Sequence, residues 1–324
     1  MQALRVERLS DDLSGCALRT VDRPIRQPGE VLIEVRAAAL NFPDLLMTRG
    51  AYQFKPEPPF TAGMELAGQV CEADAQSKFA VGDWVVGGAK TGAMAEFASI
   101  PAGKLRAVPS GLSFEKAAAF GAAYTTAYTA LVELGDLRSG QWVLVHGASG
   151  GVGLAAVDLA KAMGARVIAA TGSPHKIEAI AALYTPHAVI HADGRFREHI
   201  TDITQGALCD IVCDPVGGDV FEESTRCVAF GGKLCVMGFA GGRIADVATN
   251  IPLIKGFSIV GVRAGEYARR FPDRGRHIAD TVGAMAGNRT IDPAIDRVIA
   301  LGDWKDGFDA MANRKLVGKV IVKP

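Results

Sequence analysis

Residues 141–171 read QWVLVHGASGGVGLAAVDLAKAMGARVIAAT, and this stretch decides the fold. Gln141 to Val145 form an apolar run, rich in β-branched and aromatic side chains, that stops at a cluster of glycines, as a buried parallel strand does. Apolar residues then recur at helical spacing as far as Gly164, a residue type suited to a helix C-terminus. A second β-branched run follows at 166–170. The stretch therefore predicts a strand–helix–strand unit of an α/β fold with a parallel sheet.

The glycine turn of this unit has the spacing of a dinucleotide-binding loop. Ala148, Gly150 and Gly153 occupy its three small-residue positions, with alanine in place of the first glycine. The first position permits the tight turn, the second admits a pyrophosphate, and the third allows the helix to pack closely. Free N–H groups at the helix N-terminus bind the phosphates. We therefore predict a doubly wound Rossmann domain whose turn binds the cofactor through Ala148, Ser149, Gly150, Gly151, Val152 and Gly153.

The end of the second strand discriminates between the two nicotinamide dinucleotides. NAD-specific units carry an acid there to bind the ribose 2′-hydroxyl, whereas this chain has Ala170 and Thr171. Ser173 and Lys176 follow, and a hydroxyl and an ammonium suit a 2′-phosphate. In another interpretation Ser173 caps a helix and Lys176 faces solvent, and the two interpretations are compatible. The missing acid favours NADPH.

Composition limits the other classes of function. The length of 324 residues predicts about two domains, and the 35 basic and 35 acidic side chains cancel, so no nucleic-acid or anionic-membrane partner is expected. The first residues, MQALRVERLS, lack the continuous apolar core of a signal peptide, and no segment has the length of a membrane span. The six cysteines form no C-x-x-C pair, which favours reduced thiols and a cytoplasmic location.

Residues 1–110 contain many short strand-like runs separated by Gly and Pro, a pattern typical of a compact, barrel-like antiparallel domain. Several motifs lie here and at the other end of the chain: NFPD at 41–44, RGAY at 49–52, GMELAG at 63–68, GAMAEF at 92–97 and NRKLVGK at 313–319. Together with the glycine turn, they resemble the medium-chain dehydrogenase/reductase superfamily, and within it the zinc-free, zeta-crystallin-like quinone oxidoreductases.

The resemblance implies a GroES-like, β-rich catalytic domain at 1–121 and 265–324 around a Rossmann NADPH-binding domain at 122–264. It also implies a homodimer formed by edge pairing of the Rossmann sheets, with the FSIVGV segment (257–262) as the edge. The expected activity is NADPH-dependent transfer of hydride to a hydrophobic quinone or an α,β-unsaturated carbonyl. An enoyl-thioester reductase of the enoyl-CoA type and a non-catalytic NADPH-binding protein are the alternatives.

Zinc-dependent relatives place a cysteine near the Asn41 stretch and a histidine just before Glu65. This chain has Asn41 and Met64 there, and it lacks a lobe with four cysteines. Methionine does not replace an imidazole at a catalytic zinc, which needs three protein ligands. We therefore expect no metal, and we expect Glu65 to be a buried structural carboxylate.

Two candidate catalytic residues lie in the amino-terminal part, and the resemblance places both beside nicotinamide and substrate. Asn41 either holds a carbonyl by its amide or caps a turn before Pro43. Tyr52 either donates a hydrogen bond or proton to the acceptor or serves as a lid residue. For Thr126 the alternatives are a hydrogen bond to the cofactor carboxamide and simple helix packing.

Ligands bind at the carboxyl ends of the strands in open α/β sheets. Four residues at such ends are predicted to form walls of the cofactor site: Val216, Gly238, Phe239 and Val262. The resemblance adds Arg314 as a second contact to the phosphate. Arg263 also follows a strand, and it meets either an anionic substrate group or a surface carboxylate.

Overall fold

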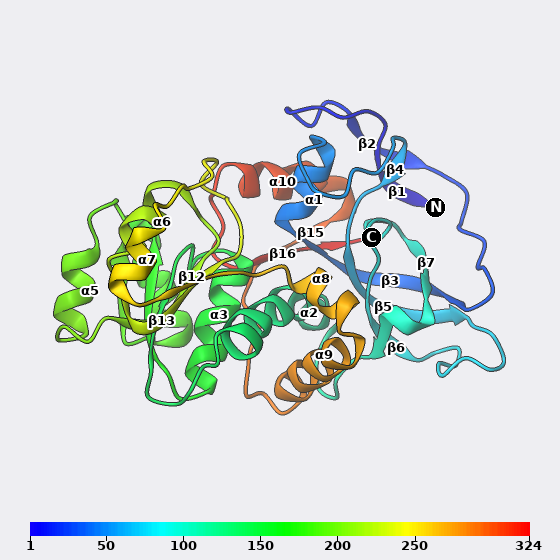
Figure 1. Ribbon diagram of the computed structural model, residues 1–324. Helices are drawn as coiled ribbons and strands as arrows, with labels where there is room; N and C mark the ends of the chain where they lie inside the picture. The colour runs from blue at the N-terminus through cyan, green and yellow to red at the C-terminus, as the bar shows by residue number, and fades with distance from the viewer. The chain divides into compact units, whose positions relative to one another are not determined.

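The computed structural model describes residues 1–324 and divides the chain into two compact units. Unit 1 comprises Met1–Gly121 and Ile295–Pro324, and unit 2 comprises Ala122–Ala294. Figure 1 labels the helices and strands of both. No helix combines the length and the apolar character needed to cross a membrane.

Unit 2 is built on a six-stranded sheet in which every neighbouring pair is parallel. Its strands, in spatial order, are β11 (Ala188–His191), β10 (Arg166–Thr171), β9 (Trp142–Val145), β12 (Cys209–Asp214), β13 (Val228–Val236) and β14 (Ser258–Gly261). The order reverses direction at β9, the strand that precedes the glycine turn, which is the arrangement of a doubly wound sheet. The predicted Rossmann architecture is therefore confirmed.

The helices of unit 2 follow the strands along the chain. They are α3 (Gly151–Ala162), α4 (Ile177–Tyr184), α5 (Arg197–Ile203), α6 (Gly218–Ser224), α7 (Asn250–Lys255), α8 (Ala264–Arg270) and α9 (Pro272–Gly287). Leu144, Ile168, Val212 and Leu234 are register partners on four neighbouring strands, so their buried side chains form one row across the sheet. Phe196 belongs to the same buried cluster. Successive residues of β9 and β10, which point to opposite faces of the sheet, are also buried, and burial on both faces explains why these strands read as apolar runs in the sequence.

The second boundary between the units lies at 294/295, whereas the sequence led us to expect 264/265. The intervening helices α8 and α9 lie side by side and belong to unit 2 (Figure 1). Tyr267 donates to Glu133 Oε2 at 2.8 Å, and Arg274 forms an ion pair with the same oxygen at 2.8 Å. These contacts join residues more than 130 positions apart, so no local pattern in the sequence signals them.

Unit 1 contains two sheets. One is antiparallel, in the order β2 (Cys16–Thr20), β1 (Gln2–Val6) and β4 (Phe60–Thr61). The other has seven strands in the order β15 (Ile295–Ala300), β16 (Lys319–Lys323), β3 (Glu30–Leu40), β5 (Glu65–Glu72), β6 (Trp84–Gly87) and β8 (Leu105–Ala107), with β7 (Phe97–Pro101) also paired to β3. The helices α1 (Phe42–Thr48), α10 (Trp304–Ala312) and the first half of α2 (Phe114–Tyr128) complete the unit.

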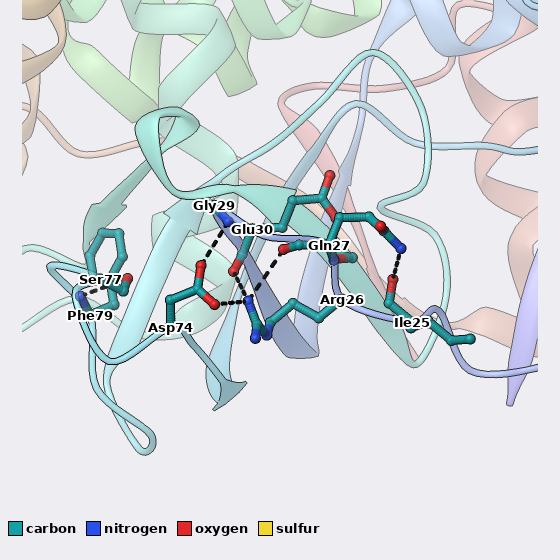
Figure 2. A network of polar contacts seen from close by, with 9 residues as sticks. Ile25, Arg26, Gln27, Gly29, Glu30, Asp74, Ser77 and Phe79 are labelled. Atoms are coloured by element: carbon teal, nitrogen blue, oxygen red, sulfur yellow. Dashed lines mark hydrogen bonds and ion pairs between the residues drawn. The ribbon is translucent and has the colours of Figure 1, made fainter.

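The long central strand β3 is fastened at its start by the polar network in Figure 2. Asp74 accepts hydrogen bonds from the Gly29 N–H at 2.7 Å and from the guanidinium of Arg26. Arg26 also donates to the carbonyls of Gln27 and Glu30. The Gly29 N–H and the Arg26 guanidinium lower the pKa of Asp74. The network thus holds the turn from which β3 departs.

Register in the large sheet places the other end of β3 between two distant segments. Val320 on β16 is opposite Leu40, and Glu65 on β5 is opposite Ala39. The residue after the end of β3 and the first residues of β5 and β16 therefore meet at one end of the sheet, where α1 starts.

Candidate functional site

The glycine turn of unit 2 is as tight as its spacing predicts. A Cβ at Gly153 would lie 2.2 Å from Gly147 O, so a larger residue does not fit where α3 packs against the turn. Ala148 is fully buried, and its N–H donates to Ala170 O at 3.0 Å, which joins the turn to β10. Gly150 precedes the first helical residue in extended conformation. The first N–H groups of α3, beside the half-buried Ser149, Gly151 and Val152, have no partner within the helix, and a terminus of this kind can bind an anion.

Two predicted cofactor residues from different turns lie together at the end of β10. Lys176 is only 4% exposed, and its Nζ lies 3.4 Å from Ser149 Oγ in the glycine turn. Ser173 is the N-cap of the short helix η3 (Pro174–Lys176), as the second interpretation expected, and it is half-buried. The interpretation of Lys176 as solvent-facing is wrong, because the side chain runs inward toward the turn.

The predicted wall residues also converge. A Cβ at Gly147 would lie 3.5 Å from Val216 Cγ2, which places the loop after β12 against the glycine turn. Phe239, after β13, lies against Gly217, where an added Cβ would be 2.8 Å from its ring. Val262 donates to Val236 O at 2.8 Å and continues the pairing of β14 with β13. Gly238 lies in the same loop as Phe239, so all four predicted residues belong to neighbouring strand ends.

Asp214 is a residue of this region that the sequence reasoning missed. It is fully buried at the end of β12, and its Oδ1 accepts the N–H groups of Val216 (2.8 Å) and Gly217 (3.0 Å). Its Oδ2 has no hydrogen-bond partner, and burial raises the pKa of the carboxyl. The carboxylate fixes the loop that carries Val216. The signal was present, because an Asp directly after an apolar strand and before Pro-Val-Gly is typical of a side chain that holds a turn.

Thr126 lies on α2 in unit 2, and its hydroxyl donates to Ala122 O at 2.7 Å. The single hydrogen of this hydroxyl is therefore used inside the helix, as the packing interpretation expects. The hydroxyl oxygen can still accept a hydrogen bond. Arg263 is exposed; hydrogen bonds from Arg269 and Arg270 are the main cause of the lowered pKa of Glu266, and the charge of Arg263 adds to them.

In unit 1, the amide of Asn41 is engaged at both of its atoms. Oδ1 accepts a hydrogen bond from Lys319 Nζ at 2.6 Å, and Nδ2 donates to Ala39 O at 3.2 Å and to Glu65 Oε2 at 3.3 Å. Asn41 is also the N-cap of α1 and donates its N–H to Asp44 Oδ2 at 2.8 Å. Asn41 thus occupies the N-cap position that the capping interpretation expects, and Asp44 stands at the third helical position.

Tyr52 and Arg314 also belong to unit 1. Tyr52 follows α1 and the left-handed Gly50, is half-buried, and packs its ring against the unit 1 core. Arg314 is exposed in the turn after α10 and has a left-handed backbone conformation with φ of 54°. Glu65 is 5% exposed, in agreement with the expectation of a buried carboxylate.

Comparison with known proteins confirms the fold assignment. Residues 151–295 match the family described as Zinc-binding dehydrogenase, and residues 27–110 match the Alcohol dehydrogenase GroES-like domain. Quinone oxidoreductase-like protein 2 of Bos taurus is 35% identical over 303 residues, which cover 93% of this chain and 86% of that protein. Quinone oxidoreductase of Pseudomonas aeruginosa is 31% identical over 300 residues, which cover 92% of each protein.

Among solved structures, the quinone oxidoreductase of Thermus thermophilus, determined alone and in complex with NADPH, is 30% identical. The similarity covers 100% of both chains, with a TM-score of 0.84. The two family matches correspond to the GroES-like and Rossmann domains that the motifs predict. The relatives that match over most of their length are named as quinone oxidoreductases or quinone oxidoreductase-like proteins. The chain therefore belongs to the medium-chain dehydrogenase/reductase superfamily of oxidoreductases, among its quinone oxidoreductase-like members.

Proposed function

We propose that this protein is an NADPH-dependent reductase that passes hydride to a quinone or an α,β-unsaturated carbonyl without a metal. One observation carries the proposal: buried Lys176 lies against Ser149 of the glycine turn, at a strand end that holds Thr171 in place of an acid. An ammonium at that place suits a 2′-phosphate, and the acid that would bind a bare ribose 2′-hydroxyl is absent. The Thermus relative, solved with NADPH, supports the same cofactor.

The residues of unit 2 fit this cofactor. The start of α3 would bind the pyrophosphate, and Ser149, Ser173 and Lys176 would bind the 2′-phosphate. When bound, NADPH supplies the hydride, while the protein orients the ring and excludes water. The wall would be formed by Thr126, Val216, Gly238, Phe239 and Val262. Arg314 of unit 1 remains a second proposed phosphate contact.

Tyr52 is the proposed hydrogen-bond or proton donor to the reduced acceptor. The amide of Asn41 already binds Lys319 and Glu65, whereas the phenol of Tyr52 has the chemistry needed at a developing oxyanion. Tyr52→Phe is expected to lower kcat by roughly tenfold or more and to leave NADPH affinity within about twofold. Steady-state rates and fluorescence titration measure the two effects. An unchanged kcat would assign the proton to water.

The side chains do not fit a catalytic zinc, although the matched family is described as zinc-binding. No group of three or more His, Cys, Asp or Glu side chains has a geometry that could hold a metal ion. Asn41 and Met64 stand where zinc-dependent relatives have ligands, and Asn41 Oδ1 accepts a hydrogen bond from an ammonium. A cation beside that oxygen opposes binding of a divalent metal.

An NADPH-oxidation assay tests the activity. The purified chain, saturated with NADPH, is offered 9,10-phenanthrenequinone and, separately, crotonyl-CoA. Turnover of the quinone supports the proposal, whereas turnover of crotonyl-CoA alone would establish the enoyl-thioester reductase. Folded protein that binds NADPH and reduces neither compound would be a non-catalytic binding protein, and the proposal would be abandoned. Addition of a chelator is expected to leave the rate unchanged.

The cofactor assignment predicts a selective effect of Lys176→Ala. Loss of a charge-assisted contact to phosphate corresponds to about 1.5–3 kcal/mol, so the Kd for NADPH should rise roughly 10- to 100-fold. The Kd for NADH should change less than about twofold, because NADH has no 2′-phosphate. Isothermal titration measures both, with the exposed Lys255→Ala as the control. Equal weakening of the two cofactors would contradict the assignment.

We further propose a homodimer in a reducing compartment such as the cytoplasm. β14 is the terminal strand of its sheet, so one of its backbone edges is unpaired. Phe230 lies over Gly256 beside this strand and is 88% exposed, and Leu253 and Ile254 on α7 are 81% and 75% exposed. A second copy paired along β14 would cover these apolar side chains. All six cysteines are free thiols and five of them are buried, which is compatible with a reducing compartment.

A further inference from the structure

A lysine from the last strand is buried at the start of α1. Val320 on β16 pairs with Leu40, so Lys319 lies beside Asn41 although 278 positions separate them. Lys319 is 5% exposed. Such a residue is rarely buried unless other groups bind its charge. Its surroundings must therefore account for an ammonium inside unit 1.

The surroundings consist of one amide and two carboxylates. Lys319 Nζ donates to Asn41 Oδ1 at 2.6 Å and lies 3.6 Å from Glu65 Oε2. Asp44, 1% exposed, interacts electrostatically with both Lys319 and Glu65. Glu65 is enclosed on another side by α2, because a Cβ at Gly121 would lie 2.6 Å from Glu65 Oε1. The ammonium is thus the positive centre of a buried cluster that contains two carboxyl groups.

The hydrogen bond from Lys319 decides how the amide of Asn41 is oriented. An ammonium only donates, so it must face Oδ1, and Nδ2 is then directed toward Ala39 O and Glu65. Asn41 is also the N-cap of α1, and the chain continues from α1 through Gly50 to Tyr52. The orientation of one amide is therefore coupled to the start of the segment that carries Tyr52.

We propose that Lys319 is a positioning residue, which holds Asn41 and thereby the segment 41–52 in the conformation that presents Tyr52 to the acceptor. The proposal rests on the proposed reductase function for the role of Tyr52. The competing explanation is a structural ion pair, in which Lys319 serves only to neutralise Glu65. The two explanations differ in what happens when both charges are removed together.

Four variants separate them: Lys319→Met, Lys319→Arg, the double variant Lys319→Met/Glu65→Gln, and Lys323→Met as the control. Lys323 lies on the same strand and pairs with Glu115 at 2.8 Å, but this pair is exposed to solvent. For each variant we would measure the midpoint of thermal unfolding, the Kd for NADPH, kcat with the quinone, and hydrogen exchange of the amides at 42–52.

We expect Lys319→Met to lower the unfolding midpoint, because it leaves Glu65 buried without its counter-charge. In the double variant the unfolding midpoint should return most of the way to the wild-type value. Its kcat should nevertheless stay about tenfold or more below wild type, because a catalytic group that is displaced from its position supports a slower reaction. Exchange at 42–52 should stay accelerated, because Asn41 Oδ1 still lacks its donor. Lys319→Arg should remain nearer to wild type in all measurements. NADPH affinity should stay within about twofold throughout, since the variants change none of the proposed phosphate contacts, which are Ser149, Ser173 and Lys176 in unit 2 and Arg314 in unit 1.

A double variant that regains kcat and normal exchange together with its stability would overturn the proposal in favour of the structural ion pair. Failure to regain the midpoint would also contradict it, because the charge-balance argument would then be wrong. Hydrogen exchange is independent of turnover. If the wild-type protein reduced no acceptor, the proposed function would fail, and exchange at 42–52 would still decide whether Lys319 positions the segment.

Discussion

At the residue scale, burial sets the charge of two side chains that look ordinary in the sequence. Asp44 is 1% exposed, and burial raises the pKa of its carboxyl to about 7. His146, next to the glycine turn, is 1% exposed, and burial lowers the pKa of its imidazole to about 3. Its Nε2 lies 2.8 Å from Ser224 Oγ, on α6. Both groups are thus partly or wholly neutral near pH 7.

The raised pKa of Asp44 predicts a pH dependence of stability. A carboxyl whose pKa rises on folding stabilises the native state below its unfolded value, near 4, and this contribution is lost as the pH rises through about 7. Asp44→Asn does not titrate, so its free energy of unfolding relative to wild type should increase by roughly 2–3 kcal/mol between pH 5 and 8. Urea unfolding at several pH values measures the difference. Asp11→Asn, at an exposed position, is the control, and parallel profiles for wild type and Asp44→Asn would contradict the argument.

At the scale of elements, the β9–turn–α3 unit depends on close approach of its backbone segments. The Cα of Gly153 packs so near Gly147 O that no side chain fits between α3 and the turn. The helix ends at Ala162, and Gly164, just after its C-cap Met163, has a left-handed φ of 79°, as expected for a residue after a helix C-terminus. These requirements act over a few residues, which is why the sequence pattern predicts this unit so clearly.

Gly153→Ala tests that requirement. The added methyl group must displace Gly147 O, from which it would lie 2.2 Å, so unfolding stability should fall by about 1–3 kcal/mol. NADPH affinity should fall as well, because the turn must move. Gly265→Ala on α8, where an added Cβ meets nothing within 4 Å, is the matched control and should be neutral or slightly stabilising. Denaturant unfolding and cofactor titration measure both effects, and a Gly153→Ala variant as stable as the control would refute the packing argument.

At the scale of the whole molecule, both points where the chain passes between the units are fastened to α3. Tyr124, just after the first crossing, donates to Asp158 Oδ2 at 2.6 Å. The N–H of Asp292, just before the second crossing, donates to the same oxygen at 2.8 Å. Tyr184 adds a bond to Asp292 O at 2.6 Å. The helix that begins at the glycine turn therefore also anchors the two connections to unit 1.

The proposed dimer gives a test at the same scale. Leu253→Asp puts a charge among the exposed apolar residues beside β14 and should convert a dimer to a monomer. Val81→Asp changes an equally apolar residue, 71% exposed in unit 1, and should leave the assembly unchanged. Light scattering coupled to size-exclusion chromatography measures the mass. A wild-type protein that is monomeric at all concentrations, or a Leu253→Asp variant that remains dimeric, would exclude this interface.

The sequence by itself determined the Rossmann unit, the glycine turn and the missing acid at Thr171, because these depend on spacing within about thirty residues. It also identified Lys176, but only the tertiary structure showed that this side chain is buried against Ser149. The boundary at 294/295 and the cluster of Asn41, Glu65 and Lys319 were decided by the tertiary structure alone. Sheet register brings these residues together from positions far apart in the chain, and burial then fixes their charges and hydrogen bonds. No local pattern records either effect.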